Sequence, residues 1–507
     1  MDADILGISG QLARGATWIA ASRILISLVG LANTLVLARL LVPDDFGLVA
    51  IAISVSAIVT SMTELSLAQA IVQHKEPTDS HYDTAFTLNF LRAACVGAIL
   101  AVVGIPAAAL YDDPRLIGIF FALAVSTLVI GAINPRLAQM SRDLVFWQDF
   151  ATRSADKLVG FFVALAVALI WQSYWALILG IIAGQTTSLI LSYIIQPYRP
   201  RFDVSKWRDL MSFSIWVGLG QAVNTINWRF DQLILGYVLG NAALGHYSVG
   251  DRLAVLPTRE ATAPVAQAVF PGFAKLADDP ERLKRAYQRA QSVLMLVALP
   301  IGVGLAVAAE PLVLLALGEQ WLPSVVVIQF LASIFAVQTI ASMVQPLSLG
   351  LGRSKILFHR SLINLCIRVP LTLIGLLTGG FIGLLIARSA AALISICVNL
   401  YLVQKILGLS VVQQIAVNVR SLMGVVVMAA AVHVVGLQFG EGGLGVQAVK
   451  VVGMIGTGIV MYPTSVLLLW LGAGRPAGPE QEIIDVAGKL KAKISGGRGT
   501  GSGDRRG

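Results

Sequence analysis

Long apolar runs follow one another along nearly the whole chain, and short polar segments separate them. A helix that crosses a bilayer needs about 20 mostly apolar residues, and on this criterion the pattern predicts about fourteen spans. The first six are expected near 16–41, 46–72, 84–110, 115–133, 155–171 and 173–195. The next six are expected near 209–239, 242–273, 287–317, 322–349, 356–378 and 381–404, and a final pair near 419–437 and 447–471.

The composition supports an all-α integral membrane protein. Hydrophobic residues make up 56% of the 507 residues and charged residues only 13%, whereas a soluble domain carries about 25% charged residues. After Gly472 the chain turns polar and rich in Gly, Lys and Arg, which predicts a disordered cytoplasmic tail. The first residues lack a basic leader with a cleavage site, so no signal peptide is expected.

Charge alternates between successive connections. Odd-numbered connections read VPDD, YDDPR, WQSY, GNAALG, GEQWLPS, TGG and QFGEGGLG. Arg115 is the only clear cation of the odd-numbered connections. The even-numbered connections hold Lys75, Arg136, Arg142, Arg153, Arg199, Arg201, Lys206, Arg208, Lys275, Arg282, Lys284, Arg285, Arg353, Lys355, Arg360 and Lys405. The positive-inside rule therefore places the even connections and both termini in the cytoplasm. The net charge of +9 is read as a signal of topology, and a nucleic-acid partner is not expected.

No motif for a metal, a cofactor or ATP is found. The three cysteines lie in apolar runs and form no CxxC pair, so neither a metal site nor a disulfide is predicted. A Walker motif is absent, which argues against ATP as the direct energy source.

A segment of the first two spans recurs 198 residues later. LVLARLLVPDDFG, residues 35–47, aligns without a gap with LILGYVLGNAALG, residues 233–245. A unit of six spans is even in number, so two copies enter the membrane from the same side and are related by a pseudo-twofold axis along the membrane normal. The predicted division is an N-lobe at 1–200, a C-lobe at 201–405, a helix pair at 406–471 and the tail at 472–507. Chance similarity between apolar helices is the alternative.

ARLLVPDDFGLVAIA and TELSLAQAIVQ in the first copy, with DQLILGYVLGNAALGHYSVGDRL in the second, resemble a known family. The resemblance, over roughly 10–405, is to the oligosaccharide flippases of the multidrug/oligosaccharidyl-lipid/polysaccharide (MOP) exporter superfamily, in particular to the Wzx-type polysaccharide transporters. It implies a transporter, not an enzyme, that flips a polyprenyl-diphosphate-linked oligosaccharide across the bacterial inner membrane by alternating access. Exopolysaccharide, O-antigen or capsule would be the product. A Na⁺ or H⁺ gradient is implied as energy source, and membrane lipid and polysaccharide polymerases or glycosyltransferases as partners.

Polar residues inside the spans are the candidates for a binding cleft. An arginine near the bilayer centre costs about 2.5–3.5 kcal/mol on insertion scales, so it is expected to face protein or water. One face of the first span carries a stripe of Arg23, Ser27, Gly30 and Thr34, and the offset of 198 maps these residues onto Gln221, Thr225, Trp228 and Gln232. Two matched stripes suit a central hydrophilic cleft. For Arg23, snorkelling to the cytoplasmic surface is the alternative.

The hypothesis for the headgroup site follows from depth, because the family resemblance supplies no position-by-position motif for these arginines. Arginine binds phosphate through paired charge-assisted hydrogen bonds. The predicted substrate-binding residues are Arg23, Arg252 and Arg368, with Arg259 and Arg388 as secondary cations and Gln221, Asn224 and Asn364 as polar contacts. The candidate ion-coupling carboxylates are Asp231, Asp251 and Glu64. Internal pairing is an open alternative for Asp251, and mutual neutralisation with Arg229 for Asp231.

Three rival functions are compatible with parts of the pattern. A small-molecule or drug exporter on the same fold would be expected to have a more apolar or acidic cavity. A flippase for peptidoglycan precursors is a second rival, and rescue of a strain depleted of that activity would decide for or against it. A membrane-bound polysaccharide polymerase or glycosyltransferase would usually carry a large periplasmic loop or a cytosolic catalytic domain, whereas every predicted periplasmic connection is short and no soluble segment is long enough for a nucleotide-sugar domain.

Overall fold

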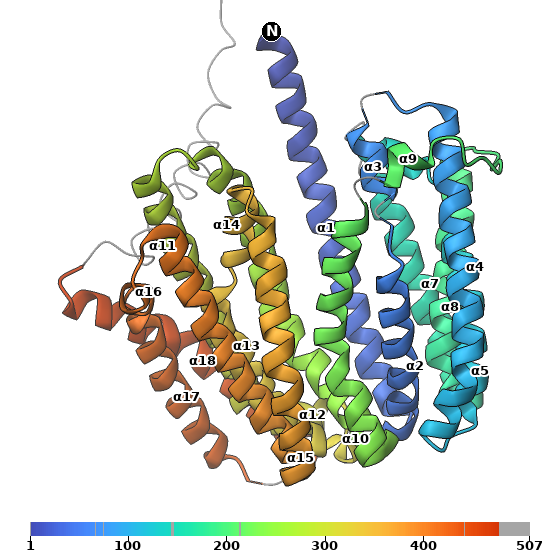
Figure 1. Ribbon diagram of the computed structural model, residues 1–507. Helices are drawn as coiled ribbons and strands as arrows, with labels where there is room; N and C mark the ends of the chain where they lie inside the picture. Colours follow the sequence, from blue (N-terminus) through green and yellow to red (C-terminus); the bar gives the residue numbers. More distant parts are fainter. Residues whose placement is uncertain are drawn as a thin grey trace, which may run out of the picture. The chain divides into compact units, whose positions relative to one another are not determined.

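The computed structural model describes residues 2–65, 67–74, 76–142, 147–211, 214–440 and 442–475. Lys75 and the tail from residue 476 onward, both considered above, lie outside these residues. The described chain is helical and contains no strand (Figure 1). Its helices are α1 (Asp2–Leu40), α2 (Pro43–Met62), α3 (Leu67–Gln73), α4 (Asp79–Leu110), α5 (Arg115–Gly131), α6 (Leu137–Arg142), α7 (Trp147–Trp171), α8 (Trp175–Ile195), α9 (Trp207–Met211), α10 (Ser214–Lys275), α11 (Pro280–Val307), α12 (Ala309–Ala316), α13 (Pro323–Gln338), α14 (Val344–Gly350), α15 (Ser354–Leu407), α16 (Val411–Ala416), α17 (Val419–Gln438) and α18 (Leu444–Gly472).

The predicted all-α, multi-span fold is confirmed. Among the described residues, 10 helices are long and apolar enough to cross a membrane, and α5 is a shorter apolar helix. Two long helices contain a non-helical glycine: α10 at Gly240 (φ 83°) and α15 at Gly380 (φ 55°). Positive φ is accessible to glycine at little cost. Both glycines lie where the sequence separates two successive spans, while the total of fourteen spans stays a prediction.

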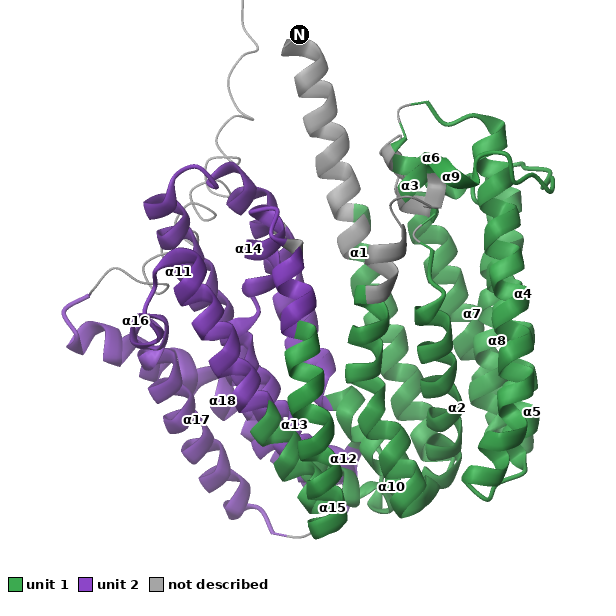
Figure 2. Ribbon diagram, in the orientation of Figure 1, with its two compact units in different colours: residues 1–253, 316–327, 361–391 green, residues 254–315, 328–360, 392–507 purple. Residues whose placement is uncertain are grey.

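Two compact units divide the chain (Figure 2). Unit 1 comprises residues 1–253, 316–327 and 361–391, and unit 2 comprises residues 254–315, 328–360 and 392–507. Each unit combines separate stretches of the chain, whereas the predicted lobes are continuous. The lobe boundaries at 200 and 405 therefore remain a prediction. Within unit 1, α4 packs on α5, and α7 packs on both α8 and α1.

Small residues let the helices of unit 1 approach closely, as is common between helices in membranes. A Cβ added at Gly180 of α8 would lie 2.8 Å from the carbonyl oxygen of Gly160 and 2.7 Å from the Cβ of Ala164, both on α7. Any larger side chain at this position would push the two helices apart.

The beginning of α2 crosses α10 just after its kink through two reciprocal glycine contacts. A Cβ at Gly47 would overlap the backbone carbonyl of Asn241, and a Cβ at Gly245 would overlap that of Pro43. The offset of 198 found in the sequence maps position 43 onto 241 and position 47 onto 245. The two contacts therefore involve the same two positions of the repeat, exchanged between its two copies. This contact between α2 and α10 does not test the division into two six-helix lobes, which remains a prediction.

A polar cluster secures the same end of unit 1. Arg115 Nη2 lies 2.7 Å from Asp113 Oδ2 and 2.8 Å from Asp44 Oδ2, and Asn241 Nδ2 donates to Asp113 Oδ2 at 3.0 Å. Burial raises the pKa of Asp113, but hydrogen bonds from the side chain and backbone of Arg115 outweigh that effect and hold the pKa below its ordinary value. The cluster joins the α4–α5 connection to α2 and α10.

Unit 2 is held by an apolar core around α11. Met295 and Leu299 of α11 belong to one buried cluster with Met428 of α17 and Met454 and Val466 of α18. The helices α17 and α18 lie where the sequence places the final pair of spans. Burial of these side chains fixes the pair against α11 within unit 2.

Candidate functional site

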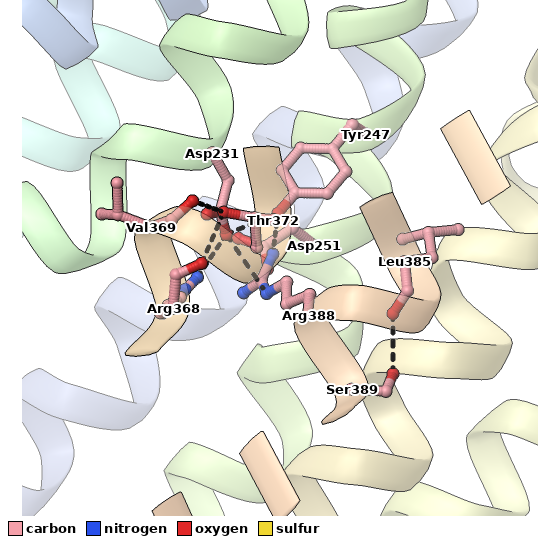
Figure 3. A network of polar contacts seen from close by, with 9 residues as sticks. All are labelled: Asp231, Tyr247, Asp251, Arg368, Val369, Thr372, Leu385, Arg388 and Ser389. Atoms are coloured by element: carbon pink, nitrogen blue, oxygen red, sulfur yellow. Dashed lines mark hydrogen bonds and ion pairs between the residues drawn. The ribbon is translucent and has the colours of Figure 1, made fainter. Parts of the chain in front are cut away.

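A buried charged cluster lies in unit 1, on the two kinked helices α10 and α15 (Figure 3). Asp231 of α10 is 1% exposed and forms an ion pair with Arg368 Nη2. Arg388 Nε lies 3.5 Å from the same carboxylate oxygen, and Tyr247 donates its hydroxyl proton to that oxygen at 3.2 Å. The carboxylate of Asp231 therefore binds two arginines that lie far from it in the sequence.

Arg388 extends the cluster to a second carboxylate. Its Nη2 donates to Asp251 Oδ1 at 2.8 Å, and its Nη1 donates to the hydroxyl of Tyr247. The side chain of Arg388 is 6% exposed, so an unpaired charge here would be costly. With two aspartates and two arginines the cluster has no net formal charge, which makes its burial tolerable.

The kinks explain why these residues meet. Asp231 precedes Gly240 in α10, whereas Tyr247 and Asp251 follow it; Arg368 precedes Gly380 in α15, and Arg388 follows it. Gly375 and Gly383 lie on either side of the kink in α15, and a Cβ at either one would overlap the backbone carbonyl of the other. The two halves of α15 thus pack tightly enough for both arginines to reach α10.

A further candidate, Arg252, faces the polar stripe predicted on α1. A Cβ at Gly30 would lie 3.9 Å from Arg252 Nη2, so the guanidinium of α10 points at the middle of that stripe. The side chain of Arg252 is exposed, and Arg23, Ser27 and Gly30 are half-buried. The structure therefore brings Arg252 opposite the predicted polar face of α1.

The first half of α10 exposes a third set of side chains. Gln221, Asn224 and Trp228 are all exposed and recur on one helical face. The guanidinium carbon of Arg368 lies 5.6 Å from the ring centroid of Trp228, within the range of a cation–π contact. Arg368 consequently links this face to the charged cluster.

The other candidates lie elsewhere. Arg259 is exposed and belongs to unit 2, while Glu64 is exposed just beyond the end of α2. Asn364 is half-buried on α15. Arg229 was the alternative partner for Asp231 in the sequence, whereas in the structure Arg368 and Arg388 form ion pairs with this carboxylate.

Arg229 instead joins a polar chain between α10 and α2. Its Nη1 donates to Gln232 Oε1 at 3.1 Å, and that oxygen also accepts from Ser54 Oγ at 2.6 Å. Tyr247 was missed in the sequence, although its position four residues before Asp251 puts the two on one helical face. Among the described residues, no group of three or more His, Cys, Asp or Glu could hold a metal ion.

Comparison with known proteins identifies the family. Residues 36–326, more than half of the chain, match the family described as "Polysaccharide biosynthesis protein". The protein belongs to this family. Its sequence is 24% identical over 406 residues to the lipopolysaccharide biosynthesis protein WzxC of Escherichia coli (strain K12), covering 79% of this chain and 82% of WzxC.

Further similarity within the polysaccharide biosynthesis family is found with the succinoglycan biosynthesis transport protein ExoT of Rhizobium meliloti (strain 1021). The two are 28% identical over 338 residues, which is 65% of this chain and 67% of ExoT. The resemblance to polysaccharide transporters of the MOP superfamily, expected from the sequence motifs, is thereby confirmed.

Two solved structures show the same fold. The lipid II flippase MurJ in an inward closed conformation superimposes with a TM-score of 0.72 and 14% identity, covering 91% of this chain and 100% of MurJ. An inward-facing multidrug resistance transporter of the MATE family, in the MOP superfamily, gives a TM-score of 0.55 and 14% identity over 76% of this chain and 98% of its own. At this identity the likeness concerns the fold alone. This polysaccharide biosynthesis protein is thus a multi-pass membrane protein with a MOP-type fold.

Proposed function

We propose that this protein is a transporter, not an enzyme, that flips a polyprenyl-diphosphate-linked oligosaccharide across the bacterial inner membrane. Family membership and the names of WzxC and ExoT support a place in polysaccharide export. Exopolysaccharide, O-antigen or capsule is the class of product. The substrate's lipid anchor stays in the bilayer while its polar head passes through the protein.

The observation that carries the proposal is the exposed guanidinium of Arg252 opposite the polar stripe of α1. Moving a hydroxyl or an anion into hydrocarbon without partners costs several kcal/mol or far more. A wet surface with arginines and amides removes much of that cost. The planar fork of arginine gives paired hydrogen bonds to a diphosphate, which suits the headgroup of a lipid-linked sugar.

The arginines divide into two roles in this proposal. Arg252 and Arg23 bind the diphosphate, with Gln221, Asn224 and Asn364 as polar contacts. Arg388 and Asp231 hold α10 and α15 together, because both are buried and paired with each other. Arg368 serves both purposes through its contacts with Asp231 and Trp228. Arg259 stays a secondary candidate.

Alternating access is the proposed route. Fourteen spans result when α5 and the two halves of α10 are added to the 10 apolar helices and α15 is divided at its glycine, with both termini in the cytoplasm. The N-lobe at 1–200 and the C-lobe at 201–405 rock about the cleft between them. Uptake of Na⁺ or H⁺ drives the cycle through Asp231, Asp251 or Glu64, and polymerases or glycosyltransferases process the product.

Reconstitution into proteoliposomes tests the proposal. The full chain should move a polyprenyl diphosphate that carries a labelled oligosaccharide from one leaflet to the other, measured by accessibility to a membrane-impermeant oxidant. A cationic dye and a peptidoglycan lipid precursor are the competing cargoes in parallel vesicles. Movement of the dye alone, or of the precursor alone, would contradict the proposal in favour of the corresponding rival.

A further inference from the structure

Trp228 lies at a depth where tryptophan has no ordinary interfacial role. It follows Ser214 by 14 residues and precedes Gly240 by 12 in the first half of α10. At about 1.5 Å per residue these separations are about 21 and 18 Å, so the indole lies near the middle of a hydrocarbon layer about 30 Å thick. Tryptophans that anchor a helix to the headgroups lie at the two interfaces instead.

The surroundings of this indole are polar. Trp228 is 46% exposed, and it shares its helical face with two exposed amides, Gln221 and Asn224. Amide groups turned towards lipid would lose their hydrogen bonds to water without replacement. Because a guanidinium also lies against the ring, this face of α10 borders the polar interior and not the lipid.

The indole is held by a chain of contacts. Arg368 lies over its ring and forms an ion pair with the fully buried Asp231. The preceding residue, Asn227, donates its Nδ2 to the backbone carbonyl of Ser361 on α15 at 3.0 Å. These contacts fix both helices and the guanidinium beside the ring, so ligand binding requires little reorganisation.

We infer that Trp228 is a stacking platform for a pyranose ring of the transported lipid-linked sugar. One face of a pyranose presents C–H bonds, whose positive ends are attracted to the negative face of an aromatic ring. The neighbouring guanidinium suits the diphosphate to which the first sugar is joined. A single ligand with a sugar next to a diphosphate therefore matches both groups, and the inference rests on the proposed function.

Binding measurements on the full chain in lipid nanodiscs test this role. The probes are a polyprenyl diphosphate that carries one N-acetylglucosamine and the same lipid without sugar. The wild type should bind the sugar-bearing lipid about tenfold more tightly, equivalent to about 1.4 kcal/mol. Trp228→Ala should bind the two lipids with nearly equal affinity, while Trp228→Phe keeps most of the difference.

Controls separate stacking from packing. Trp228→Leu preserves an apolar side chain without a π face and should behave as the alanine variant does. Trp171→Ala removes a 60% exposed tryptophan at the end of α7 and should change neither affinity. All variants are first compared by thermal midpoint and monodispersity, and Trp228→Leu supplies the result if Trp228→Ala does not fold.

Three results would overturn the inference: an equal loss of both lipids in Trp228→Ala, no loss of either, or full affinity in Trp228→Leu. A wild type that binds both lipids equally yet flips the lipid-linked oligosaccharide would refute the stacking role and leave the proposed function standing. A wild type that neither binds nor flips these lipids would contradict the proposed function itself, and the inference with it.

Discussion

Replacement of Asp231 by asparagine should strongly destabilise the protein, because its carboxylate pairs with the buried Arg388 and with the half-buried Arg368. The change removes the ion-pair partner of Arg368 and one of the two carboxylates near Arg388. The formal charge of the cluster then rises from zero to +1. Breaking a buried pair from one side typically costs about 3–5 kcal/mol, a large part of the about 5–15 kcal/mol that stabilises a typical protein.

The decisive assay is a double-mutant comparison of thermal midpoints in detergent. Arg368→Gln in the Asp231→Asn background restores a neutral cluster and should recover at least half of the lost stability, since the two side chains are in direct contact. Asp149→Asn is the matched control: it removes an exposed ion pair with Arg153 and should cost less than about 1 kcal/mol.

Two outcomes would refute this reasoning. Asp231→Asn could prove as stable as the wild type, which would mean that the cluster does not need its charge balance. Alternatively, Arg368→Gln could add its own full loss to that of Asp231→Asn, which would mean that the two residues act independently.

Three further predictions concern packing, hydrogen bonding and pH. Gly245→Ala should lower the thermal midpoint by an amount equivalent to about 1–3 kcal/mol, because its Cβ overlaps a backbone carbonyl, whereas Gly272→Ala, with nothing within 4 Å, should not. Trp321→Phe should cost about 0.5–1.5 kcal/mol by removing the indole donor 2.7 Å from the carbonyl of Ala38 at the end of α1, to which Gln320 Nε2 still donates at 3.0 Å; an unchanged midpoint would count against that bond. The lowered pKa of Asp113 contributes stability above the unfolded-state value of about 3.9, and this contribution disappears as pH falls through the folded-state value. Thermal midpoints between pH 7 and 3 should therefore drop less in Asp113→Asn than in the wild type.

Much of the fold is accessible from the sequence because membrane spans are long, apolar and separated by polar connections. Gly240 and Gly380 lie within one or two residues of the predicted breaks between spans, and α17 and α18 match the last predicted pair. The expected second span, 46–72, is too long, because α2 ends at Met62 and Leu67–Gln73 form the separate helix α3. The short helices α6 and α9 were not predicted, since 5 or 6 residues carry too little periodicity. The helix α1 begins at Asp2, upstream of the expected apolar run, because helical hydrogen bonding does not require apolar side chains.

Only part of the candidate site could be predicted from the sequence. Helical periodicity puts Arg23, Ser27 and Gly30 on one face, and the depth of Arg252 makes it a candidate for the same interior. The sequence could not show that Asp231 selects Arg368, 137 residues away, over its neighbour Arg229. Pairing across helices depends on how each helix is rotated about its axis and where it is kinked, and neither follows from the order of residues along one helix.

The central claim is that an exposed arginine opposite α1 shelters a sugar-diphosphate headgroup during its passage, and the flipping rate of Arg252→Ala tests it most directly. In proteoliposomes matched for inserted protein, this variant should lose flipping of the polyprenyl-diphosphate-linked oligosaccharide, whereas Arg252→Lys should keep part of it because it retains the charge without the planar fork. Flipping by Arg252→Ala at the wild-type rate would contradict the account.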